Sequence, residues 1–114
     1  MIRYASIERV TDTSTDLHDN VITPGWDMII RGKNIKVTEK GDFGGIFLFG
    51  SDGKLIRMDE ELIINESGRI ITRVPLLLSS GSYKLLIITK YDEVAEPSGY
   101  WVITYKHLLS VREN

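Results

Sequence analysis

The chain has 114 residues, a formal net charge of −2 at pH 7 and no cysteine, and hydrophobic residues make up 42% of it. These values predict a single domain over residues 1–114, with a first strand and polar loop in 1–21 and a sandwich body in 22–111. The lack of cysteine excludes disulfides, thiolate metal sites and cysteine nucleophiles. The slightly acidic balance gives no general attraction to phosphate backbones or anionic membranes.

No apolar run reaches the roughly 20 residues that a membrane-spanning helix requires. The N-terminal residues also lack the apolar segment of a signal peptide. We therefore expect a cytoplasmic protein with no membrane partner, or an extracytoplasmic one if a signal peptide has been removed.

The first predicted strand lies within residues 2–10, with Ile7 and Val10 facing inward, and a polar stretch follows it. Asp12, Ser14 and Asp16 have the first spacings of a calcium-binding loop, but Leu17 stands where that loop requires glycine. The stretch is therefore predicted to be a solvated loop.

The middle of the chain alternates short apolar runs with turn signals. Strands are predicted at 26–31, at 35–37 after a break, and at 46–49. The Asp52-Gly53 pair predicts a hairpin that folds residues 54–58 back on the preceding strand. The acidic run 59–61 is predicted to be a solvated corner.

The most strongly patterned stretch is residues 70–91. A strand that Pro75 closes is followed by a turn at Gly81 and by a long strand over 83–91. Alternate residues of the long strand face opposite sides, which predicts Tyr83, Leu85 and Ile87 inward. A last strand at 100–105 is expected to pair with it, with Trp101, Ile103 and Tyr105 inward.

No segment shows the 3.6-residue period of an amphipathic helix, whereas seven or eight short strands are separated by turn signals. The sequence therefore predicts an all-β, two-sheet antiparallel sandwich, and a closed barrel remains the alternative.

No catalytic constellation is found, and no cofactor or metal site is predicted. His18 and His107 lie far apart in the sequence, and neither has a patterned neighbour. The pairs Lys33/Lys36 and Lys84/Lys90 do not form a basic stripe in a chain of net negative charge, so direct nucleic-acid contact is disfavoured.

An apolar outward surface is the main functional candidate. If the odd positions of the long strand face inward, its even positions face outward, and the candidate surface consists of Leu86, Ile88, Tyr100 and Val102. An exposed patch of this kind favours contact with a protein or a second copy. The alternative is that loops or the C-terminal tail of the same chain cover it.

A second hypothesis concerns the aromatic residues of the loops. Trp26, Tyr91 and Trp101, together with Tyr100, could stack on sugar rings in a module that binds carbohydrate or cell-surface material. Exposed, coplanar rings at one end would favour this function over a protein contact.

Two sets of motifs resemble known families. Residues 7–12 (IERVTD), 22–25 (ITPG) and 28–35 (MIIRGKNI) resemble the opening of IPT/TIG-type immunoglobulin-like domains. A closer resemblance is to the Ig-like C-terminal domain of unknown function from Bacteroidetes HU-like (IHF-like) DNA-binding proteins. It is carried by residues 65–75, 81–85 (GSYKL), 89–91 (TKY), 96–97 (EP) and 109–111 (LSV).

The resemblance implies an immunoglobulin-like sandwich that is a non-catalytic accessory module for protein–protein interaction or assembly. It implies DNA association only indirectly, through a separate HU-like domain, and a nucleoid-associated setting. The family strand equivalent to 83–91 generally carries polar residues on its outer side, where this chain has Leu86 and Ile88.

Overall fold

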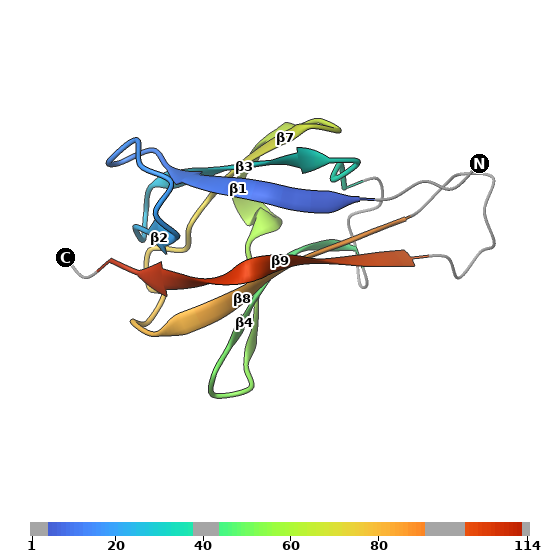
Figure 1. Cartoon of the computed structure of the whole chain (residues 1–114). Helices are drawn as coiled ribbons and strands as arrows, with labels where there is room; N and C mark the ends of the chain where they lie inside the picture. Colours follow the sequence, from blue (N-terminus) through green and yellow to red (C-terminus); the bar gives the residue numbers. More distant parts are fainter. Residues whose placement is uncertain (1–4, 38–43, 91–99, 113–114) are drawn as a thin grey trace.

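The computed structural model describes residues 5–37, 44–90 and 100–112, and it leaves out the side chains of Lys90, Tyr100 and Trp101. The described residues form two layers of β-sheet that face each other (Figure 1). The four-stranded sheet has the order β1 (Ser6–Asp12), β3 (Asp27–Lys33), β7 (Arg69–Arg73) and β6 (Leu62–Asn65). The five-stranded sheet has the order β2 (Val21–Ile22), β9 (Tyr100–Val111), β8 (Ser82–Lys90), β4 (Gly45–Gly50) and β5 (Leu55–Arg57).

This arrangement confirms the predicted all-β, two-sheet sandwich. Neighbouring strands pair antiparallel except for β2, which pairs parallel with β9. The described part of the chain has nine strands, and one of them, the two-residue β2, is not among the seven or eight that the sequence predicts. A parallel pair this short has no periodicity by which the sequence could reveal it.

The core lies between the sheets and is built from the inward residues of both. Tyr83, Leu85 and Ile87 of β8 are buried, as are Ile103 and Tyr105 of β9, and all five belong to the main hydrophobic cluster. Their alternation with more exposed residues confirms the predicted inward face of β8 and the inward positions of Ile103 and Tyr105 on β9, and Trp101 remains a prediction.

The stretch between β7 and β8 carries the chain from one sheet to the other. β7 ends at Arg73, two residues before Pro75, and β8 begins directly after Gly81, whose φ of +142° favours glycine. Because β7 and β8 belong to different sheets, the two strands do not pair with each other. Instead β8 pairs with β4 and β9.

The hairpin predicted from Asp52-Gly53 is confirmed. β4 and β5 pair antiparallel, and Gly53 takes a φ of +84° in the turn between them.

The segment 35–37 does not form the predicted strand. Ile35 and Val37 are nevertheless buried in the main hydrophobic cluster, and the side-chain amide of Asn65 binds both backbone groups of Val37. The Asn65 Oδ1 accepts from the Val37 amide at 2.9 Å, and Nδ2 donates to the Val37 carbonyl at 2.8 Å. The Ile35 amide donates to the Ser67 carbonyl at 3.0 Å, and the Thr89 hydroxyl donates to the Lys36 carbonyl at 2.6 Å. Scattered partners thus replace the ladder of hydrogen bonds that a neighbouring strand would supply.

Two acidic residues expected in solvated segments are buried instead. Asp59 opens a short 3₁₀ helix (Asp59–Glu61) and is fully buried, where Arg57 Nη1 donates to its carboxylate at 3.2 Å. Asp12 at the end of β1 is 1% exposed. Its carboxylate accepts from the Thr23 hydroxyl at 2.6 Å and from the Ser14 amide at 3.0 Å. Both predictions of a solvated carboxylate were wrong, because hydrogen-bond donors of the protein replace water around each carboxylate.

Candidate interaction surface

The outward face of the five-stranded sheet carries the residues that the sequence singled out. Leu85 and Ile87 face the core, so Leu86 and Ile88, which alternate with them along β8, face outward. Leu86 and Ile88 are each half-buried. Val102 lies opposite Ile88 on β9 and is 61% exposed. Tyr100 lies opposite Lys90 in the register, but its side chain is outside the described residues.

The same face continues over β4 and β5 with residues that the sequence did not single out. Phe49 lies directly opposite Leu55 on one side and Lys84 on the other, and Lys84 lies opposite Leu108. Phe49, Leu55 and Leu108 are 43%, 53% and 58% exposed. The apolar face is therefore defined by Leu86, Ile88, Val102, Phe49, Leu55 and Leu108.

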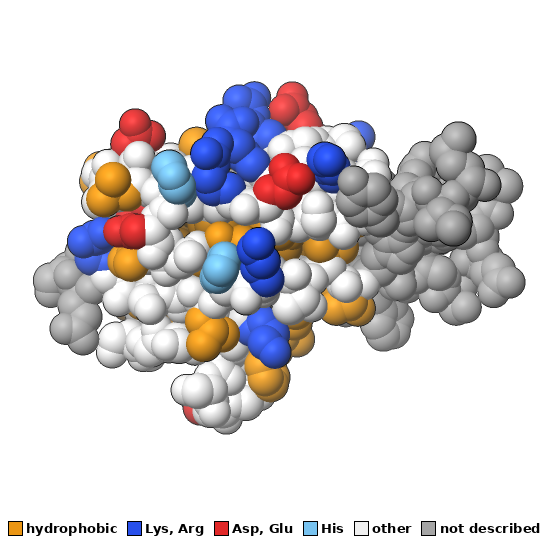
Figure 2. Space-filling model, in the orientation of Figure 1, with side chains coloured by type: hydrophobic (Ala, Val, Ile, Leu, Met, Phe, Trp, Pro, Cys, Tyr) orange, Lys and Arg blue, Asp and Glu red, His pale blue; other side chains and the backbone are white. Residues whose placement is uncertain are grey.

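The C-terminal residues that the structure describes do not cover this face. Residues 106–111 continue β9 in the plane of the sheet instead of folding over it. Figure 2 shows hydrophobic side chains at the surface of the lower layer, which is the five-stranded sheet.

A buried aromatic residue anchors the centre of the face. Phe47 lies opposite Leu86 and Arg57, points away from the main core cluster and is still only 6% exposed. The Arg57 guanidinium carbon lies 4.7 Å from the ring centroid and covers one side of the ring. Arg57 is itself held by Asp59, so the cover over the ring is fixed in place.

The aromatic residues of the alternative hypothesis are described only in part. Trp26, in the turn before β3, is 54% exposed. Tyr91 and the side chain of Trp101 lie outside the described residues. Tyr105 is buried and donates from its hydroxyl to Asn20 Oδ1 at 2.6 Å, so it belongs to the core.

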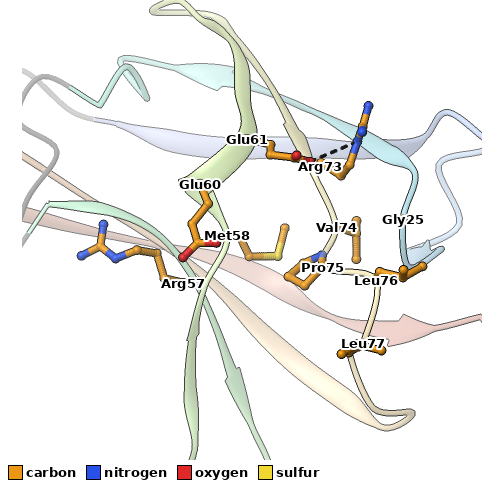
Figure 3. A pocket seen from close by; sticks show the side chains of 10 residues that line it. All are labelled: Gly25, Arg57, Met58, Glu60, Glu61, Arg73, Val74, Pro75, Leu76 and Leu77. Atoms are coloured by element: carbon orange, nitrogen blue, oxygen red, sulfur yellow. Dashed lines mark ion pairs between the residues drawn. The ribbon is translucent and has the colours of Figure 1, made fainter.

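A pocket of about 620 Å³ opens between the 3₁₀ helix and the β7–β8 connection (Figure 3). Its apolar lining comes from Met58, Val74, Pro75, Leu76 and Leu77. Leu76 and Leu77 are 70% and 91% exposed at its rim.

Most charged side chains that line this pocket form ion pairs. Arg73 pairs with Asp27 at 3.0 Å and with Glu61 at 3.5 Å, and these two carboxylates raise the pKa of Arg73. Arg57 pairs with Asp59 at 3.2 Å. Glu60 also lines the pocket, and its carboxylate forms no ion pair within the described residues.

Within the described residues, no three or more His, Asp or Glu side chains come together in a group that could hold a metal ion. His18 and His107 are both exposed, and the His107 ring meets Tyr105 edge-on at 5.4 Å. In the same part of the chain, no helix is long and apolar enough to cross a membrane.

Residues 6–98 match the family model described as a domain of unknown function (DUF4469) with an Ig-like fold. The chain belongs to this family. The match confirms the expected immunoglobulin-like class and the expectation of an Ig-like domain of unknown function. Among curated proteins, none matches the chain.

A crystal structure from Bacteroides vulgatus ATCC 8482, named as a putative bacterial DNA binding protein, has a similar fold. Its TM-score is 0.83 at 24% sequence identity, over 94% of this chain and 47% of that chain. At this identity the likeness shows the fold alone, and this chain spans about half the length of that protein.

Proposed function

We propose that this DUF4469 domain is a non-catalytic accessory module that binds protein through the apolar face of its five-stranded sheet. The observation that carries the proposal is the row Leu55, Phe49, Lys84 and Leu108, whose three apolar members are each more than two-fifths exposed. Full burial of one large apolar side chain is worth about 1.5–3 kcal/mol, so covering these residues favours association.

The proposed setting is a longer protein that acts on DNA. The structural neighbour is named as a DNA-binding protein and is about twice as long as this chain, which leaves room in it for a second domain. In this setting a separate HU-like domain holds the DNA, and the module described here makes the protein contact.

A site-specific photo-crosslinker tests the protein contact. Placed at Val102, it should give one discrete adduct with a protein in the cell that makes this domain. The matched control is the same probe at Ile63, which is 52% exposed on β6 of the other sheet. Equal adducts at the two positions, or none at Val102, would contradict the proposal.

The partner in this proposal is another protein or a second copy of the chain, and light scattering separates the two. A second copy predicts a dimer of the purified wild-type domain that the Ile88→Lys substitution converts to a monomer. A monomer in both cases leaves another protein as the partner.

A carbohydrate-binding module is the second candidate, and the exposure of Trp26 favours it. Trp26 directly follows Gly25, which lines the pocket, so a sugar ring stacked on the indole would lie beside that pocket. A glycan array with the wild type and Trp26→Ala tests this function. Binding that the substitution abolishes would support it, and the lack of any binding would remove it.

A further inference from the structure

Three arginines lie side by side across the four-stranded sheet. In the strand register, Arg9 of β1 lies directly opposite Arg31 of β3, and Arg31 lies directly opposite Arg69 of β7. Arg9 and Arg31 are exposed and Arg69 is half-buried. Neighbouring strands are about 4.8 Å apart, so this arginine row spans about 10 Å. Figure 2 shows Lys and Arg side chains gathered over the upper layer, which is this sheet.

The positive charge of the row is only partly neutralised. Arg69 pairs with Glu66 at 3.4 Å, between side chains that are 39% and 60% exposed. Within the described residues, Arg9 and Arg31 have no ion pair. Glu8 is also close in sequence, at the bulge of β1, but no carboxylate of the described residues lies within 4 Å of either guanidinium group.

The arginine row is expected to destabilise the fold instead of stabilising it. Like charges directly opposite each other on adjacent strands are destabilising, and Arg31 has such a neighbour on both sides. Elsewhere on the same sheet, Arg73 lies opposite Asp27 and pairs with it, which is the arrangement that stability favours.

We propose that the arginine row binds the phosphate backbone of a nucleic-acid duplex. Guanidinium groups bind phosphate through two parallel hydrogen bonds, and a row of them fits a ligand with regularly repeated charges.

An acidic protein segment is the competing occupant, and the exposure of the row disfavours it. An exposed pair of arginine and carboxylate adds little affinity, because water and salt screen its charges. A nucleic acid also releases its condensed counterions for each phosphate that is neutralised, so exposed arginines gain affinity from it.

This inference goes beyond the proposed function, in which DNA is held by a separate domain. It concerns the opposite sheet and does not depend on the apolar face. Failure of the phosphate contact would leave the Val102 crosslinking result unaffected.

Fluorescence anisotropy with a labelled 20-base-pair DNA duplex, at several salt concentrations, tests the proposal on the whole 114-residue chain. The variant is Arg9→Gln with Arg31→Gln, and the control is Lys54→Gln with Lys106→Gln. The control removes the same charge from exposed residues of the β4–β5 turn and of β9. A cooperative thermal unfolding transition above room temperature in each variant shows that both are folded.

We expect the arginine variant to weaken binding about 10-fold at 50 mM salt and to lower the salt dependence by about 1.8 in log–log slope. The lysine control should bind within about twofold of the wild type. Absence of wild-type binding, or equal losses in both variants, would overturn the proposal. Competition by polyglutamate as effective as that by unlabelled duplex would also overturn it, in favour of an acidic protein partner.

Discussion

The guanidinium group of Arg57 covers the ring of Phe47 at 4.7 Å from its centroid, and the same group pairs with the buried carboxylate of Asp59. One side chain thus stabilises both an outward-facing aromatic ring and an inward-facing charge.

The substitution Arg57→Ala should therefore lower the free energy of unfolding by about 1–3 kcal/mol, because Asp59 loses a donor in a buried position. Urea unfolding checks the value. The control Arg57→Lys keeps the charge but not the planar fork, and we expect an intermediate loss. A change below 0.5 kcal/mol for Arg57→Ala would show that the pair is not structural.

A second prediction concerns the buried hydroxyl of Thr23. It donates to Asp12 Oδ2 at 2.6 Å and lies 2.9 Å from the Ser14 hydroxyl. Thr23→Val should lower the free energy of unfolding by about 1–3 kcal/mol, because a buried carboxylate loses a hydrogen bond. Thr13→Val removes a bond of 2.6 Å to the Asp27 carbonyl in an exposed position and should change stability by less than about 0.5 kcal/mol. Equal effects of the two substitutions in urea unfolding would contradict the prediction.

Gly32 allows β1 and β3 to pair closely. A Cβ atom at this position would lie 2.1 Å from the Ser6 carbonyl oxygen, which belongs to the backbone and has little freedom to move. Gly32→Ala should therefore lower the free energy of unfolding by more than about 2 kcal/mol. At Gly68 the nearest atom is 3.6 Å from such a Cβ, so Gly68→Ala is the matched control and should be tolerated. Thermal unfolding of both variants checks the difference.

Tyr105 makes the free energy of unfolding depend on pH in the alkaline range. Burial raises the pKa of its phenol above the ordinary value of 10.0, against an opposing hydrogen bond from the Val10 backbone. The folded state therefore holds the proton more tightly than the unfolded state does. This contribution to stability is complete below pH 10.0 and is lost as the pH rises through the raised pKa.

The experiment is urea unfolding between pH 8 and 11. Wild-type stability should fall at the alkaline end more steeply than that of Tyr105→Phe. Parallel curves for the two proteins would rule out this contribution from Tyr105.

The arginine row predicts an unusual sign for one surface substitution, and Arg73 on the same sheet provides the comparison. Arg31→Gln should raise the free energy of unfolding by about 0.2–1 kcal/mol, because it removes two like-charge contacts. Arg73→Gln should lower it, because Arg73 pairs with Asp27 at 3.0 Å. Added salt should reduce both differences. A loss of stability in Arg31→Gln would show that Arg31 makes a favourable interaction in the fold.

The number of short strands separated by turn signals was sufficient to predict the two-sheet class. The alternation along β8 and β9 was sufficient to predict the inward residues Leu85, Ile87 and Ile103. The same alternation placed Val102 on the outer surface. The burial of Asp12 and Asp59 was not predicted, because their donors Thr23 and Arg57 become neighbours only through tertiary structure or a local turn.

The arginine row was also beyond the reach of sequence patterns. Arg9, Arg31 and Arg69 are separated by 22 and 38 residues, and only the strand register brings them together. A search for clustered lysines and arginines along the chain therefore passes over them.

The last described strand, β9, lies between β8 and the short edge strand β2 in its sheet. The backbone amide of Arg112 also donates to the Ile22 carbonyl at 2.7 Å. During synthesis, β8 and β2 cannot pair with β9 until residues 100–112 have left the ribosome. Until then β8 presents an unpaired edge, which is the kind of surface that chaperones protect from aggregation.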